Sequence, residues 1–81
     1  ASSHIAELVS RIRSHSQVPV VAGVGISTPE QARAAARSAD GVIVGSALVR
    51  QVLEADDSRD AVDRLRVAVS EFAAAVRDLA D

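Results

Sequence analysis

Two short apolar strands with a single helix between them constrain the fold of this chain more than any other feature. Residues 18–24 form a run rich in β-branched side chains that closes at Gly25, and residues 42–44 form a second run that closes at Gly45, 20 positions later. Neither run alternates between apolar and polar residues, which is typical of strands covered on both faces, as in parallel sheets. Strands that alternate with helices pair in parallel, so the sequence predicts a compact βαβ unit in an α/β fold.

The helix between these strands carries the clearest local signal. Thr28 stands at the expected N-cap, Pro29 at the first helical position and Gln31 at the third, which together form a capping box with a well-placed proline. A stripe of small side chains follows at Ala32, Ala35, Ala36 and Ala39. Because small side chains let a helix approach a sheet closely, this stripe predicts the face that packs on the strands.

Three further helices complete the predicted order of elements. An apolar stripe at helical spacing predicts a helix over 3–16, a brief helix follows over 46–53, and a long one runs from Ser58 to about Ala80. Two parallel strands alone would leave both sheet edges unpaired and apolar faces exposed. We therefore expect residues 1–81 to be a single segment of a larger sheet or barrel, or to associate with copies of itself, and not to be a complete domain.

The carboxyl ends of the two strands are the expected binding site. Gly25 and Gly45 each follow a strand at the end where parallel α/β folds place their ligands. Gly45 and Ser46 also begin a predicted helix, whose free N–H groups and positive dipole end favour an anion. Two such loops can hold a phosphate group without Lys, which this chain lacks. The alternative is that both glycines are only turn residues, and Arg50 either reaches the phosphate or faces solvent.

Charge and composition argue against several other classes. The net charge of −2 and a single aromatic residue, Phe72, disfavour a nucleic-acid binder. The longest apolar run, residues 18–26, is too short to span a membrane, and no export signal is visible, so we expect a cytoplasmic protein. No metal site is expected. His4 and His15 lie about 16 Å apart along one helix, and the acidic cluster at positions 56, 57, 60 and 63 lacks the pattern of a calcium loop and suits a helix start.

Two stretches of the chain resemble the C-terminal part of the tryptophan synthase alpha chain. Residues 20–31 are similar to the family's Gly-aromatic-Gly-Ile-Ser segment after strand seven, and residues 40–49 are similar to its segment after strand eight. The resemblance covers essentially all 81 residues. It implies the C-terminal quarter of a (βα)8 TIM barrel, strands seven and eight with flanking helices, plus the helix that precedes them.

The resemblance also implies a function. The family is a lyase that cleaves indole-3-glycerol phosphate to indole and glyceraldehyde 3-phosphate in tryptophan biosynthesis, together with a beta chain that carries pyridoxal phosphate. No cofactor is implied for this chain itself. The substrate phosphate is expected at Gly25, Gly45 and Ser46, and the indole side of the pocket at Val24 and Ile43. Val24 stands where the family more often has an aromatic residue.

The catalytic groups of the family have no counterpart in this sequence. The family's catalytic Glu and Asp lie around strand two, and cleavage needs a general acid–base group within hydrogen-bond reach, so we expect no lyase activity from this segment alone. Two alternatives stay open. One is another phosphate-binding barrel, such as a sugar-phosphate isomerase of histidine biosynthesis, although residues 25–30 speak against it. The other is a non-catalytic helical interaction module in which the long final helix is the functional part.

Overall fold

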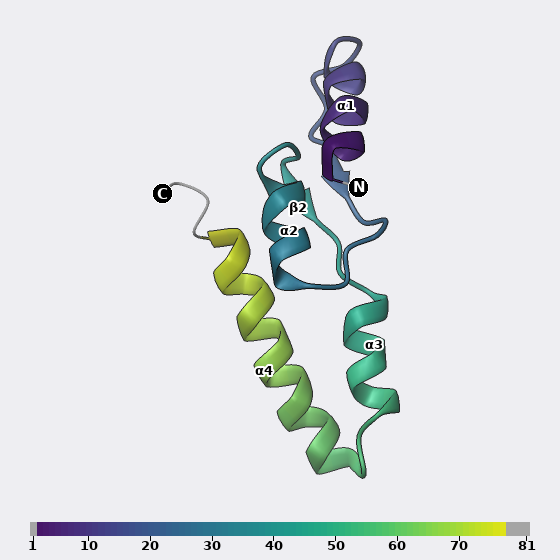
Figure 1. Ribbon diagram of the computed structural model, residues 1–81, viewed down its shortest axis with the longest axis vertical. Helices are drawn as coiled ribbons and strands as arrows, with labels where there is room; N and C mark the ends of the chain where they lie inside the picture. Colours follow the sequence, from purple (N-terminus) through teal and green to yellow (C-terminus); the bar gives the residue numbers. More distant parts are fainter. Residues whose placement is uncertain (1, 78–81) are drawn as a thin grey trace.

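The computed structural model describes residues 2–77, which contain the predicted βαβ unit followed by a helical hairpin (Figure 1). The order of elements is the predicted one. These elements are α1 (Ser2–Arg13), β1 (Val21–Ala22), α2 (Pro29–Ala36), β2 (Gly41–Val42), α3 (Ser46–Leu53) and α4 (Ser58–Arg77). The predicted end of the last helix near Ala80 lies outside the described residues. Within residues 2–77, no helix combines the length and the apolar character needed to cross a bilayer.

The two strands pair in parallel, as predicted, but they are shorter than the apolar runs that contain them. Val21 is opposite Gly41 and Ala22 is opposite Val42, and the N–H of Ile43 donates to the carbonyl oxygen of Ala22 at 2.8 Å. The expectation that both faces are covered is not met within the described chain, since Val21 is 54% exposed. Within residues 2–77 each strand has one neighbouring strand. The regular ladder covers two residues per strand.

Asp40 stabilises the amino end of the sheet by hydrogen bonds to Val20. Its backbone N–H donates to the carbonyl oxygen of Val20 at 2.7 Å, and its side chain accepts the N–H of Val20, also at 2.7 Å. Arg13, at the end of α1, forms an ion pair with the same carboxylate at 3.0 Å. The Val20 amide and then the Arg13 guanidinium hold the pKa of Asp40 below its ordinary value. Reciprocal bonds between Asp40 and Val20 therefore extend the pairing of the strands by one residue.

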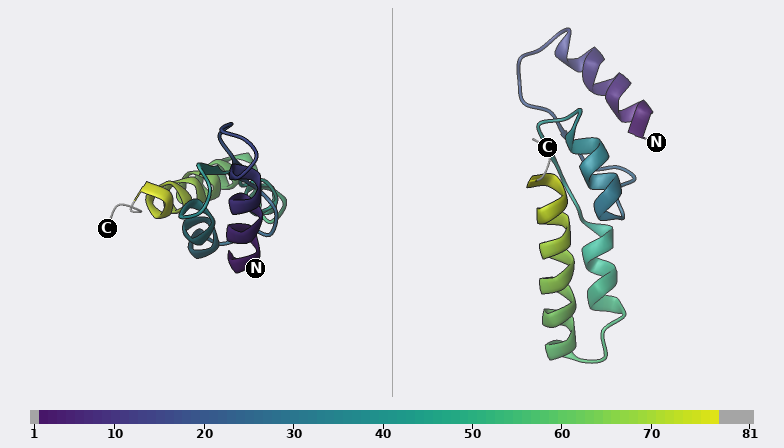
Figure 2. Two further views of the ribbon diagram at one scale, coloured as in Figure 1. Left: turned by 90° about the horizontal axis from the view of Figure 1, so that it is seen from above. Right: turned by 60° about the vertical axis from the view of Figure 1, so that its left-hand side comes forward.

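Helix α2 packs on the sheet through the predicted stripe of small side chains. All four alanines of that stripe are buried, and Ala32 and Ala35 form a core cluster with Ile26. Phe72 and Val76 of α4 also pack against this cluster. Figure 2 shows α4 alongside α2 and α3. Because alanines leave the backbones close together, one long helix can cover α2 and α3 at once.

Helices α3 and α4 form an antiparallel pair whose connection is capped by side chains. Arg64 of α4 donates from Nε to the carbonyl oxygen of Gln51 at 3.2 Å and pairs with the carboxylate of Glu54 at 3.2 Å, at the carboxyl end of α3. At the start of α4, Asp57 accepts the N–H of Asp60 at 2.8 Å. The acidic cluster therefore serves the helix start, as the sequence predicts.

Candidate functional site

The loops after β1 and β2 leave the sheet at the same edge. Gly25 follows Ala22 by three residues and Gly45 follows Val42 by three, and Ala22 and Val42 are opposite each other in the parallel register. In Figure 1 the segment that enters α2 and the segment that enters α3 lie beyond the same end of the strands. The predicted arrangement of two glycine-bearing loops at the carboxyl ends of neighbouring strands is therefore present.

Gly25 occupies a conformation that side chains rarely adopt. Its φ is +77°, and a Cβ built on it would have no heavy atom within 4 Å. The next residue, Ile26, is 5% exposed and packs on Ala32 and Ala35 of α2. Glycine is therefore needed for the turn itself, while the space beside it stays open.

The chain after Gly25 is held by the predicted capping box. Thr28 Oγ1 accepts the backbone N–H of Gln31 at 3.1 Å, and Gln31 Oε1 accepts the N–H of Thr28 at 3.2 Å. Gln31 Oε1 also accepts the N–H and the hydroxyl of Ser27, at 2.8 and 2.9 Å. The sequence predicts the box itself, but the bonds to Ser27 depend on the loop conformation and carry no sequence signal.

Gly45 and Ser46 form the start of α3, as predicted. Gly45 is the N-cap, with φ −115° and ψ −70°, and its carbonyl oxygen accepts the N–H groups of Leu48 and Val49 at 3.0 Å each. Within residues 2–77, the amides of Gly45 and Ser46 donate to no other group, and no side chain caps the helix. Both residues are exposed, and a Cβ on Gly45 would again meet nothing within 4 Å. This end of α3 can accept an anion.

Val24 and Ile43 lie near the glycines in the chain, and both are largely exposed. Val24 is 87% exposed and lies at the end of an apolar groove of about 190 Å³, between β1 and the Leu8 face of α1. Ile43 is 58% exposed and lies beside Gly23, with its Cβ 3.3 Å from where a Gly23 Cβ would stand. Both apolar side chains are therefore available at the strand ends. Arg50 is exposed on α3, one turn beyond Ser46.

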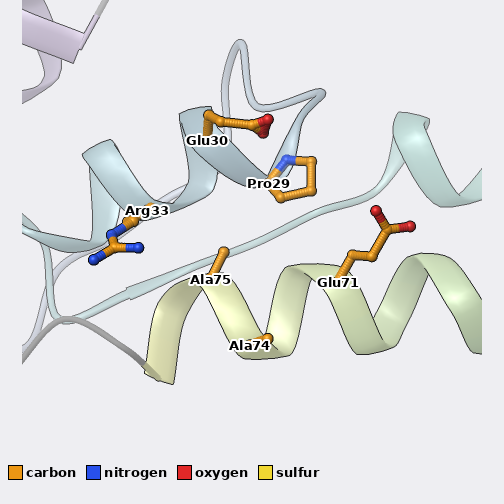
Figure 3. Close-up of a pocket in the computed structure, with 6 residues that line it drawn as sticks. All are labelled: Pro29, Glu30, Arg33, Glu71, Ala74 and Ala75. Atoms are coloured by element: carbon orange, nitrogen blue, oxygen red, sulfur yellow. The ribbon is translucent and has the colours of Figure 1, made fainter.

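A second hollow lies between α2 and α4, away from the strand ends. It has a volume of about 450 Å³ and is lined by Pro29, Glu30, Arg33, Glu71, Ala74 and Ala75. Figure 3 shows the Arg33 guanidinium and the Glu71 carboxylate pointing to different ends of this hollow, over a floor of alanines. Binding and catalytic sites bring polar groups together on one point, and these groups diverge. The loops at the strand ends remain the candidate site.

Residues 1–77 match the family model of the tryptophan synthase alpha chain. No solved structure matches the chain.

Proposed function

The chain belongs to the tryptophan synthase alpha chain family, and from this we propose that it supplies the phosphate-binding part of the indole-3-glycerol phosphate site. The family consists of lyases of tryptophan biosynthesis with a TIM barrel fold, and its members pair with a beta chain. A helix-rich segment with two parallel strands is consistent with part of such a barrel. In the proposal β1 and β2 are strands seven and eight, and residues 1–81 are the last quarter of the barrel with the preceding helix.

The observation that carries the proposal is the common edge of the two loops. Two residues lie between the end of each paired strand and its glycine. The start of α3 offers the amides of Gly45 and Ser46, which have no acceptor among residues 2–77. Backbone N–H groups at a helix start bind a phosphate through hydrogen bonds and through the helix dipole. The Ser46 hydroxyl adds a further donor. A phosphate ester can be held in this way by a chain that has no Lys.

Anchoring the phosphate would serve the reaction by orientation. A substrate fixed at one end presents its reacting bond in a restricted position, which lowers the entropic part of the barrier. Val24 and Ile43 expose apolar side chains near the same edge and are proposed to contact the indole ring. Burial of such a ring against aliphatic side chains is favourable by about 25 cal/mol per Å² of apolar surface.

The proposal gives this segment a binding role and no proton-transfer role. The cleavage needs an acid–base pair, and no residue here matches the family's two catalytic carboxylates, so residues 1–81 alone are proposed to be inactive. Pyridoxal phosphate is assigned to the beta-chain partner, not to this chain, and the site is proposed to act in the cytoplasm. Adding indole-3-glycerol phosphate to the isolated segment and detecting indole would contradict the proposed division of roles.

The family match supports this function over the two alternatives. A histidine-biosynthesis isomerase would belong to a different family from the one that matches 1–77. A purely helical interaction module would leave Gly25 and Gly45 without a ligand, which is a difference that can be measured.

The test is a titration of the ¹⁵N-labelled full chain with glycerol 3-phosphate, with neutral glycerol as the control ligand. We expect the amide signals of Gly25, Gly45 and Ser46 to shift with the phosphate ester and not with glycerol. The amide of Asp60 is an internal control, because it also lies in a first helical turn but already donates to Asp57. Unchanged signals at all three residues, or equal shifts with glycerol, would overturn the proposal.

A further inference from the structure

Gln31 makes more hydrogen bonds to the preceding loop than a helix cap requires. In a capping box the third helical side chain accepts one backbone N–H, from the N-cap residue. Here Gln31 Oε1 accepts that N–H, from Thr28 at 3.2 Å, and accepts the N–H and hydroxyl of Ser27 at 2.8 and 2.9 Å. The two shorter bonds therefore reach the residue before the cap, two positions after Gly25.

Two successive anchors hold the chain as it leaves Gly25. The Ile26 side chain is 5% exposed and packs in the core cluster with Ala32 and Ala35. Ser27, the next residue, is exposed and is tied to α2 through Gln31. Gly25 has no side chain of its own to fix it and lies at φ +77°. The direction of its amide is therefore set by β1 before it and by what holds the residues after it.

We propose that Gln31 is a positioning residue for the phosphate site: its side-chain oxygen fixes Ser27 and Thr28, and thereby holds the amide of Gly25 ready for a phosphate ester. This inference rests on the proposed function. Gln31 itself does not contact the ligand and acts only through the loop. A loop that is ordered before binding loses less conformational entropy when the ligand binds, and the ligand is therefore bound more tightly.

The capping box offers a matched pair of variants that separates positioning from helix stability. Gln31→Met removes the three bonds to Oε1 and keeps the bond from the Gln31 backbone N–H to Thr28 Oγ1. Thr28→Val removes that last bond and keeps the other three. Both substitutions are close to isosteric and both weaken the start of α2. Only Gln31→Met releases Ser27, and with it the loop that begins at Gly25, from α2.

The measurement is the dissociation constant for glycerol 3-phosphate in the full chain, followed through the Gly25 and Gly45 amide signals. We expect Gln31→Met to raise the dissociation constant about fivefold, and Thr28→Val to raise it by less than about twofold. Hydrogen exchange of the Ser27 and Thr28 amides should accelerate in Gln31→Met alone. Ser27→Ala, which removes only the hydroxyl bond, is a milder second variant and should raise the dissociation constant by about twofold.

Each outcome has a distinct meaning. Equal effects of Gln31→Met and Thr28→Val would show that helix stability is all that matters and would overturn the inference. An unchanged dissociation constant in both Gln31→Met and Ser27→Ala would overturn it as well. Ser46→Ala reports on the proposed function separately. If Ser46→Ala weakens binding while Gln31→Met behaves like Thr28→Val, the role of Gln31 fails alone. If no amide at the strand ends responds to the ligand, the proposed function fails.

Discussion

Replacing each of the two glycines by alanine should separate folding from binding. Gly25 and Gly45 both have open space where a Cβ would stand, but their backbones differ. Gly25 has φ +77°, where a Cβ is strained, whereas Gly45 has φ −115°, where it is not. A methyl group at either position would enter the space proposed for the phosphate. We therefore expect both variants to bind the ligand poorly and only one to be destabilised.

The sizes of the two effects follow from the backbone angles. Placing alanine in the left-handed region costs about 1–2 kcal/mol. The reduced freedom of the unfolded chain offsets part of this cost, so Gly25→Ala should lose about 1 kcal/mol of the free energy of unfolding. At an N-cap, alanine is worse than glycine by about 0.7 kcal/mol. The reduced freedom of the unfolded chain returns about 0.4–1 kcal/mol, so Gly45→Ala should change stability by less than about 0.5 kcal/mol. The dissociation constant of Gly45→Ala for glycerol 3-phosphate should rise by about tenfold or more. The reason is that one hydrogen bond from an amide to the charged phosphate contributes about 1.5–3 kcal/mol.

Stability is best measured by urea unfolding followed by circular dichroism, because the chain has no Trp or Tyr to report fluorescence. Binding is measured by the glycerol 3-phosphate titration of amide signals. A Gly45→Ala protein that binds the ligand as tightly as the parent would refute the reasoning, because the open space at Gly45 would then not be the phosphate site. A Gly25→Ala protein as stable as the parent would show that the positive φ is not required for folding.

Three further predictions concern the scaffold. Asp40→Asn should lower stability at neutral pH, because the Val20 amide and Arg13 depress the pKa of Asp40 from its ordinary value of 3.8. In urea unfolding, this difference in stability between the variant and the parent should persist above pH 3.8 and vanish as the pH falls through the lowered pKa of Asp40. A stability difference that stays constant in acid would contradict this prediction. Arg64→Met should cost about 1 kcal/mol in the same assay by uncapping α3, so an equally stable variant would argue against this cap. Ala32→Leu should cost about 1–3 kcal/mol because Ala32 is fully buried, whereas Ala74→Leu, at an exposed position on α4, should change little.

Local signals in the sequence predicted the elements that depend on neighbouring residues. The Thr28-Pro29-Glu30-Gln31 run identifies the start of α2 because a capping box is complete within four positions. The stripe from Ala32 to Ala39 likewise identifies the packed face, since burial of a helix follows its own periodicity. The parallel pairing of the strands follows from the single helix between them.

Features that depend on contacts between distant residues were not predictable. Asp40 and Val20 are 20 positions apart, and neither residue type predicts the two hydrogen bonds between them. The apolar runs also gave strands that were too long, because the length of a ladder depends on the partner strand and not on composition. At the candidate site, the sequence predicted that the loops of Gly25 and Gly45 lie at one edge of the sheet. It did not predict the bonds from Ser27 to Gln31, because they follow from the turn at Gly25, whose φ no pattern reveals.

The contrast between the two glycine backbones has an evolutionary consequence. In relatives of this chain that do not bind the proposed phosphate ester, selection for a folded chain alone would still retain glycine at position 25, because its φ is +77°. Position 45, unstrained and facing open space, would be free to drift toward larger residues. Without the ligand, substitutions would therefore accumulate faster at position 45 than at position 25.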